Sequence, residues 1–171
     1  MEMAYKSCMV SVMDSDQEIC DTGRNVFDPI GSYSRPNMSA AEKILEMTKR
    51  ARTPYVVSVV DDDQAVRDAL GNLLESVGLQ VEAFASAEEF VQSNRGKTKS
   101  CLILDVMLPR MSGLELQQYL SGKPGSVPII FISAHSSDEV RCRALQKGAV
   151  SFLSKPFKSE DLLSAVHSTL L

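Results

Sequence analysis

Short apolar runs alternate with segments of helical periodicity from residue 55 to the last residue, and this alternation limits the fold more than any other feature. Residues 55–60 form a β-branched apolar run, which is typical of a buried strand. Residues 64–77 carry apolar side chains at helical spacing and precede Gly78, a common helix stop. The unit then repeats along the chain. Strands are predicted at residues 55–60, 79–85, 101–104, 128–132 and 150–153, and helices at residues 64–77, from residue 86, and at 112–120, 137–147 and 159–171.

Strands that are separated by helices predict right-handed βαβ crossovers, and therefore an α/β protein with a parallel sheet. We expect Ile132, Val140, Leu145 and Val150 in its core. The helix from Ser86 should begin with a capping box, because Glu89 follows three residues later. In a parallel sheet of this kind, ligands bind outside the carboxyl ends of the strands. The residues at those ends are therefore the first candidates for a functional site.

Polar residues follow four of the five predicted strands. Asp61 and Asp62 end the first strand, Asp105 the third and Ser133 the fourth, and Lys155 follows the fifth. Each has an ordinary explanation when taken alone: a strand-end aspartate is usually a cap or turn residue, a serine caps a helix, and a lysine is solvated. The combination at four strand ends is not expected by chance, so it indicates a site.

The chemistry of these side chains suits phosphoryl transfer. Three carboxylates at one edge of a sheet repel each other and are tolerated when a divalent cation such as Mg²⁺ lies among them. A carboxylate can attack phosphorus to form an aspartyl-phosphate, and the transferred group spreads its charge over its equatorial oxygens. The ammonium of Lys155 and the hydroxyl of Ser133 are suited to contact those oxygens.

Five motifs in this region resemble those of bacterial response-regulator receiver domains, the CheY-like family, and in particular the receivers of FixJ/LuxR-type regulators. The motifs are Val59-Val60-Asp61-Asp62-Asp63, Leu102-Ile103-Leu104-Asp105-Val106-Met107-Leu108-Pro109, Met111-Ser112-Gly113, Phe131-Ile132-Ser133-Ala134 and Lys155-Pro156-Phe157. They run in order through residues 55–171. The resemblance implies a three-layer (βα)5 flavodoxin-like fold, a doubly wound parallel sheet with the strand order 2-1-3-4-5.

The same resemblance implies the phosphoacceptor receiver of a two-component phosphorelay. Asp105 would take a phosphoryl group from a sensor histidine kinase or a histidine phosphotransfer protein. Ser133 would contact the phosphoryl oxygens, and Lys155 would pair with them. The domain would catalyse only its own phosphorylation and dephosphorylation, and so would not be an enzyme in the usual sense.

The resemblance also implies a Mg²⁺ site. Asp62 would bind the ion, Asp61 would act directly or through water, and Asp105 and the backbone carbonyl of Met107 would complete the protein ligands.

A conformational switch is the last implied feature. Phe152 falls where the family keeps an aromatic residue, whose ring would swing inward as the hydroxyl of Ser133 moves. Phosphorylation adds about −1.5 to −2 of charge, which would bias the surface formed by the fourth helix, the fifth strand and the fifth helix of the predicted domain. A homodimer through this face is an open expectation.

Residues 1–53 differ from the rest, because no helix or strand period persists in them. We interpret them as a flexible N-terminal extension with one short helix near residues 40–50, and residues 54–171 as the receiver domain. Ser39 and Glu42 form a capping-box pattern ahead of Ile44, which predicts where that helix begins. A docking or dimer-forming helix is the alternative interpretation.

Composition excludes several function classes. The net charge is −4, with no block of like charge, so direct binding to nucleic acid is not expected. The four cysteines and two histidines lack the spacing of a zinc site or a disulfide framework. No apolar run approaches the about 20 residues that span a membrane, so we expect a cytoplasmic protein.

The chain stops just after the last predicted helix, with no DNA-binding output domain, which leaves a stand-alone receiver, a truncated product or a fragment as alternatives.

Two other functions are weighed against the receiver. A pseudo-receiver would serve as a scaffold without phosphorylation. A phosphatase of the haloacid-dehalogenase type would use the Asp-x-Asp pattern of Asp61 and Asp63, but the late strand lacks the acidic cluster that such enzymes need. The cognate kinase, the signal and the output are not readable from the sequence.

Overall fold

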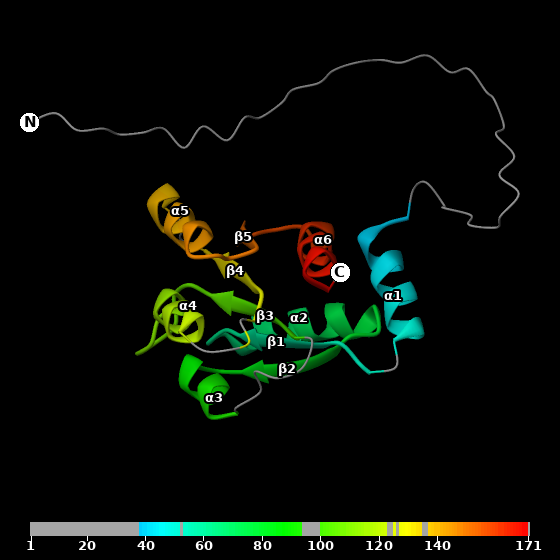
Figure 1. Ribbon diagram of the computed structural model, residues 1–171, viewed down its shortest axis with the longest axis horizontal. Helices are drawn as coiled ribbons and strands as arrows, with labels where there is room; N and C mark the ends of the chain where they lie inside the picture. The colour runs from blue at the N-terminus through cyan, green and yellow to red at the C-terminus, as the bar shows by residue number, and fades with distance from the viewer. Residues whose placement is uncertain are drawn as a thin grey trace, which may run out of the picture. The chain divides into compact units, whose positions relative to one another are not determined.

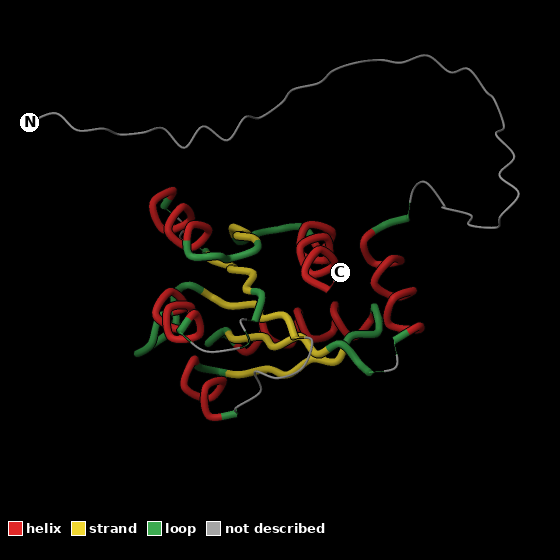
Figure 2. The backbone as a smooth tube through the Cα atoms, in the orientation of Figure 1, coloured by secondary structure: helices red, strands yellow, loops and turns green. Residues whose placement is uncertain are grey.

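Five parallel strands form the central sheet of the protein, in the order β2-β1-β3-β4-β5 (Figures 1 and 2). The computed structural model describes residues 38–170 apart from residues 52, 94–99, 123, 124, 126, 135 and 136. The strands are β1 (Val56–Val60), β2 (Gln80–Phe84), β3 (Ser100–Asp105), β4 (Ile129–Ser133) and β5 (Ser151–Ser154). The helices are α1 (Ala40–Arg50), α2 (Gln64–Ser76), α3 (Ala87–Gln92), α4 (Gly113–Ser121), α5 (Asp138–Gln146) and α6 (Ser159–Leu170). The flavodoxin-like fold and its strand order are therefore confirmed, and the five helices predicted after residue 54 are α2 to α6.

Helices cover both faces of the sheet, which gives three layers (Figure 1). Alternate residues of β3 show how the two cores are divided. Cys101 and Ile103 pack in the core that includes α2 and α6, while Leu102 and Leu104 pack in the core that includes α3, α4 and α5. All four side chains are fully buried. A strand that is buried on both faces needs the continuous apolar run that the sequence has there.

Side-chain caps fix where two of the helices near the carboxyl edge of the sheet begin. The side chain of Asp63 accepts a hydrogen bond from the backbone N–H of Ala65, at 2.8 Å, and so starts α2. Ser112 and Glu115 form a complete capping box at the start of α4. Caps of this kind satisfy N–H groups that have no partner within the helix. Both helices are thereby held directly beyond the strand ends that carry the aspartates.

The capping box predicted for α3 is wrong in one detail. Ser86 caps the helix by accepting from the N–H of Glu89, but the Glu89 carboxylate accepts from the N–H of Ala85 and not from that of Ser86. Ser86 is more extended, with φ at −153°, than the N-cap residues of the two complete boxes, Ser39 at −62° and Ser112 at −65°. This backbone conformation turns the N–H of Ser86 away from the carboxylate.

Two of the four residues predicted to lie in the core are exposed instead. Ile132 is fully buried and Val140 packs against the core, as predicted. Leu145 is 40% exposed and Val150 is 44% exposed. Leu145 follows the buried Ala144 by one residue, which turns it about 100° away around the helix axis. Val150 precedes β5, which is an edge strand with no neighbour on its outer side.

Helix α1 is the short helix predicted near residues 40–50, and its capping box between Ser39 and Glu42 is formed. The helix packs beside α6 (Figure 1), and its Ile44 is fully buried in the same core as Leu162 and Val166 of α6. The apolar face of α1 is thus buried against the helices that cover the sheet. Of the flexible extension predicted for residues 1–53, residues 1–37 and residue 52 lie outside the described residues.

A glycine permits the close approach of α1 to the turn after α2. The hydroxyl of Thr48 lies 3.4 Å from the carbonyl oxygen of Val77, within hydrogen-bond distance. A Cβ atom on the next residue, Gly78, would lie 2.8 Å from that hydroxyl. Gly78 also has a φ of +83°, a backbone conformation that residues other than glycine rarely adopt.

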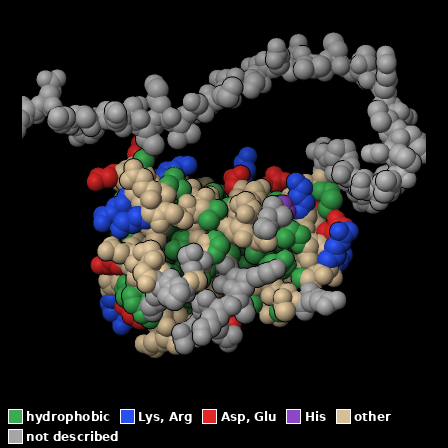
Figure 3. Space-filling view, viewed as in Figure 1, with side chains coloured by type: hydrophobic (Ala, Val, Ile, Leu, Met, Phe, Trp, Pro, Cys, Tyr) green, Lys and Arg blue, Asp and Glu red, His purple; other side chains and the backbone are tan. Residues whose placement is uncertain are grey.

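The surface carries charge of both signs. On the face shown in Figure 3, apolar patches lie among Lys, Arg, Asp and Glu side chains, and neither sign forms a continuous stripe. Within the described part of the chain, no helix combines the length and the apolar character that crossing a membrane requires.

The docking of α1 can be tested at Ile44. We expect Ile44→Ala to lower the free energy of unfolding by about 2–5 kcal/mol, because it leaves a cavity at a fully buried position. Urea unfolding followed by circular dichroism measures this change. The control is Lys49→Ala on the exposed face of the same helix, which should change it by less than about 0.5 kcal/mol. Equal midpoints for the two variants would contradict the packing of α1.

Cys101 should make stability depend on alkaline pH. Burial raises the pKa of its thiol to about 11, from an ordinary value of 9.0. Because the pKa is higher in the folded than in the unfolded protein, the contribution of the neutral thiol is complete below pH 9 and is lost as the pH rises through 11. The difference in urea midpoint between wild type and Cys101→Ala should shrink over this range. A difference that stays constant over the same range contradicts the prediction; Cys142→Ala, at a partly exposed thiol, is the control.

Candidate functional site

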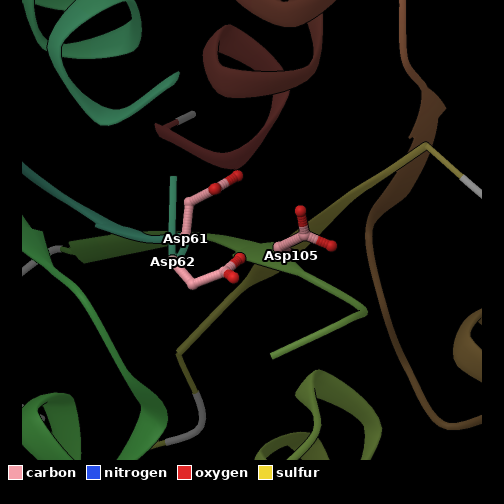
Figure 4. A group of neighbouring side chains, drawn as sticks. All are labelled: Asp61, Asp62 and Asp105. Atoms are coloured by element: carbon pink, nitrogen blue, oxygen red, sulfur yellow. The ribbon is translucent and has the colours of Figure 1, made fainter. Parts of the chain in front are cut away.

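Three aspartates meet at the carboxyl edge of the sheet (Figure 4). Asp61 and Asp62 directly follow β1, and Asp105 is the last residue of β3, which pairs with β1. Each contributes one carboxylate oxygen to a group whose atoms all lie within 4.8 Å of one another. Asp61 and Asp105 are buried, whereas Asp62 is exposed. Adjacent parallel strands thus bring together the three carboxylates that the sequence predicted to converge.

Lys155 holds two of these carboxylates together. Its ammonium group lies 2.7 Å from Oδ2 of Asp61 and 2.7 Å from Oδ2 of Asp105. The lysine reaches the site from the segment between β5 and α6, and its backbone N–H donates to the carbonyl oxygen of Ser133, at 2.8 Å. The predicted meeting of Asp61, Asp62, Asp105 and Lys155 is therefore present in the structure.

The electrostatics of the site reflect its burial. Desolvation raises the pKa of the Asp61 carboxyl, and the hydrogen bonds from Lys155 and from the N–H of Asp63 oppose this only in part. Burial acts to lower the pKa of the Lys155 ammonium, but its hydrogen bonds to Asp105 and Asp61 outweigh that effect and raise it. The lysine therefore remains charged. It cannot by itself offset the cost of burying the carboxylate of Asp61.

Backbone donors orient the two buried carboxylates. Oδ1 of Asp61 accepts from the N–H of Asp63 at 2.9 Å, and Oδ1 of Asp105 accepts from the N–H of Met107 at 2.8 Å. These bonds engage one oxygen of each carboxylate, while the other oxygen faces Lys155.

Two residues that contact the site were not assigned a role from the sequence. Arg67 on α2 donates from Nη1 to the backbone carbonyl oxygen of Asp61, at 2.7 Å, and so fixes the end of β1. No sequence motif at this spacing predicts the contact of Arg67 with Asp61. A Cβ atom on Gly113 would lie 2.3 Å from the carbonyl oxygen of Asp105, so only glycine fits there. Its place in the Met111-Ser112-Gly113 motif is the signal that could have indicated this constraint.

The remaining predicted site residues lie close by in the chain or the sheet. Ser133 ends β4, one residue beyond Ile132, which pairs with Asp105 in the sheet, and is fully buried. Met107 is two residues beyond Asp105 and has an exposed side chain. Phe152 on β5 is buried, with its ring 6.0 Å from that of Phe131 between ring centres.

The donor set fits a hard divalent cation. The three carboxylates and one ammonium carry a formal charge of −2 when all are ionised, three negative groups against one positive. Carboxylate oxygens are the ligands that Mg²⁺ prefers, and a cation would relieve the cost of burying Asp61. The acidic triad is typical of the Mg²⁺ site of a receiver domain.

Comparison with known proteins agrees with this geometry. Residues 57–167 match the response regulator receiver domain family, so the chain belongs to that family, whose members are signalling domains and not conventional enzymes. Receiver domains have histidine kinases as partners.

Individual relatives give the same picture. The transcriptional regulatory protein TdiR of Thauera aromatica is 45% identical over 92 residues, which cover 54% of this chain and 40% of that protein. The structure of the response regulator StyR is similar with a TM-score of 0.65 and 43% identity, covering 69% of this chain and 60% of that one. The structure of FixJ-N is similar with a TM-score of 0.64 and 31% identity, covering 69% and 94%. The chain thus matches less than half of the length of curated relatives such as TdiR.

Binding of Mg²⁺ is testable through stability. We expect MgCl₂ to raise the melting temperature of the wild type, because an ion that binds only the folded state stabilises it by about 2.7 kcal/mol at 100 times its Kd. Asp62→Asn should remove most of this Mg²⁺-dependent increase. Asp68→Asn, which changes the charge equally at an exposed position of α2, should leave it intact. An increase of equal size in all three proteins would contradict a specific site.

Proposed function

We propose that this protein is the phosphoacceptor receiver of a two-component phosphorelay and that Asp105 receives the phosphoryl group. The observation that supports this most is the contact of a single ammonium group, that of Lys155, with both Asp61 and Asp105 at 2.7 Å. The arrangement holds a positive charge beside the carboxylate that would become phosphorylated. The donor would be a phosphohistidine of a sensor kinase or of a histidine phosphotransfer protein.

The transfer itself needs little from the protein besides position and charge. A carboxylate oxygen of Asp105 would attack phosphorus while the bond from phosphorus to the donor nitrogen breaks, and the imidazole keeps the electron pair. Lys155 would pair with the phosphoryl oxygens, and the hydroxyl of Ser133 would donate to one of them. Asp61, Asp62 and Asp105, together with the carbonyl of Met107, would hold Mg²⁺, which supplies positive charge next to the phosphoryl group.

A protein donor needs a surface on which to dock beside Asp105. An open, mainly apolar groove of about 440 Å³ borders Lys155, and its lining includes Val66, Leu73 and Phe157. The groove lies between α2 and the start of α6, close to the acidic cluster. It supports the proposal that the donor is a protein.

Phosphorylation would be read out on the face formed by α5, β5 and α6. The new charge would draw Ser133 toward the phosphoryl group, and the aromatic ring of Phe152 would move into the space that Ser133 vacates. Leu145 and Val150 are large exposed apolar side chains on this face. They support the proposal of a homodimer there, because apolar side chains at the surface favour association.

We further propose that residues 54–171 are the receiver domain and residues 1–53 an extension to it. The match to the receiver family at residues 57–167 lies within the proposed domain. Helix α1 then belongs to the extension, although Ile44 packs in the core of the domain.

Incubation with acetyl phosphate and Mg²⁺ tests the proposal. We expect intact-mass analysis to show one added phosphoryl group on the wild type and none on Asp105→Ala. Asp68→Ala, at an exposed aspartate of α2, should be labelled like the wild type. Lys155→Met should lower the labelling rate by about 10²-fold or more, in line with the loss of a group that stabilises developing charge.

Three outcomes would count against it. Label that survives Asp105→Ala would place the phosphoryl group elsewhere. No label on the wild type would favour a scaffold without phosphorylation. Repeated turnover of p-nitrophenyl phosphate would favour a phosphatase, because a receiver labels itself and does not process external esters efficiently.

A further inference from the structure

A buried glutamine connects α4 to α5 at a distance from the acidic cluster. The side chain of Gln117 is only 2% exposed. Its Nε2 donates to the backbone carbonyl oxygen of Ala144, at 2.9 Å, in the last turn of α5. Its Oε1 is also buried and has no hydrogen-bond partner among the described residues.

The unpaired acceptor of Gln117 carries a free-energy cost. Leaving a buried polar atom without a partner costs about 1–3 kcal/mol, whereas an apolar side chain of the same length would cost nothing of this kind. The neighbouring residue Leu116 is apolar and fully buried, so α4 contributes apolar side chains to this core at other positions. The amide of Gln117 therefore points to a role other than filling the core.

The carbonyl that Gln117 contacts is a junction between α5 and β5. The oxygen of Ala144 also accepts from the N–H of Ala149, at 3.1 Å, in the turn that follows α5. The next residue, Val150, donates to the carbonyl of Ile129 on β4 and so begins the pairing of the edge strand. Gln117 thus holds the point at which α5 ends and the chain enters the strand that leads to Lys155.

The start of α4 lies against the proposed phosphoacceptor. Gly113 lies four residues before Gln117 and therefore on the same side of the helix. A Cβ atom at Gly113 would be 2.3 Å from the carbonyl oxygen of Asp105 and 3.1 Å from the ring of Phe131. Because the backbones of Gly113 and Asp105 approach so closely, a shift of the Asp105 backbone would push on the start of α4.

We propose that Gln117 is a positioning residue that couples the phosphorylation state of Asp105 to the position of α5. The inference rests on the proposed phosphorylation of Asp105 and adds a route through α4 to the proposed movement of Ser133 and Phe152. Because Oε1 has no partner to lose, turning the amide away from Ala144 gives up only one hydrogen bond. The hydrogen bond from Gln117 to Ala144 can therefore break and re-form. It holds α5 in one position before phosphorylation and releases α5 afterwards.

Hydrogen exchange on the full-length chain tests the coupling. Spectra are compared with and without Mg²⁺ and beryllofluoride, a mimic of the phosphoryl group. In the wild type, we expect the mimic to increase exchange at the amides of α5 and of residues 147–149. In Gln117→Met, which keeps the length but loses the amide, these amides should exchange about 3- to 10-fold faster before the mimic is added, as expected for one lost hydrogen bond. The additional increase with the mimic should be less than half of that in the wild type.

The matched control is the adjacent Gln118→Met. Gln118 is exposed and accepts from Nζ of Lys147 at 3.1 Å, so this variant removes a surface contact near the same helix. It should keep the response of the wild type. Labelling of Gln117→Met by acetyl phosphate should stay within about twofold of the wild type, because the residue does not touch the reacting groups. An unchanged exchange response in Gln117→Met would overturn the inference.

A measurement on the wild type covers the case in which Gln117→Met does not fold. The side-chain amide resonance of Gln117 should shift when Mg²⁺ and beryllofluoride are added, and should not shift in Asp105→Ala. A resonance that stays in place in a wild-type sample that is labelled on Asp105 would overturn the coupling alone. A wild type that acetyl phosphate does not label would instead overturn the proposed function.

Discussion

Repulsion among the carboxylates of Asp61, Asp62 and Asp105 is the constraint on which the rest of the structure depends. Asp61 and Asp105 are buried, and both form an ion pair with Lys155. The sheet places them together because β1 and β3 are parallel neighbours, so their carboxyl ends share one edge. The backbone N–H groups of Asp63 and Met107 and the side chain of Arg67 then hold the strand ends in place. A site with excess negative charge and fixed geometry is suited to bind a cation together with the proposed phosphoryl group, which is itself charged.

The two faces of the sheet serve this site differently. On one face, α2 and α6 border the apolar groove next to Lys155, and α1 covers the side of α6 with Ile44. On the other face, α4 begins against the backbone of Asp105 and contacts α5 through the side chain of Gln117. The first face suits the approach of a donor, and the second suits the transmission of a change at Asp105. The division follows from the doubly wound topology, in which a strand that is central in the sheet contacts helices on both sides.

The sequence predicted the elements well where local rules decide them. The buried strands and the capping box of α1 depend on residues within a few positions of each other. The capping box of α3 was wrong for a local reason, because the Glu89 carboxylate accepts from Ala85 and not from Ser86. The other wrong predictions depended on neighbours from elsewhere in the fold. Leu145 and Val150 are apolar and were expected in the core. Leu145 instead lies on the side of α5 away from the buried Ala144, and Val150 lies beside β5 at the edge of the sheet. The contact of Arg67 with Asp61 could not be predicted, because it depends on how α2 folds back over the end of β1.

By itself, the sequence determined which chemical groups stand at the strand ends, because each group directly follows an apolar run that can only be a strand. It also determined the fold class, because short strands and helices in alternation have few ways to bury both faces of a sheet. Only the tertiary structure decided that one ammonium group bridges Asp61 and Asp105, that α1 packs on α6, and that a buried amide joins α4 to α5. These contacts join residues that are 27 or more positions apart in the chain, as in the bond from Gln117 to Ala144. Local propensity carries no information about such pairs; the packing of whole elements against each other sets them.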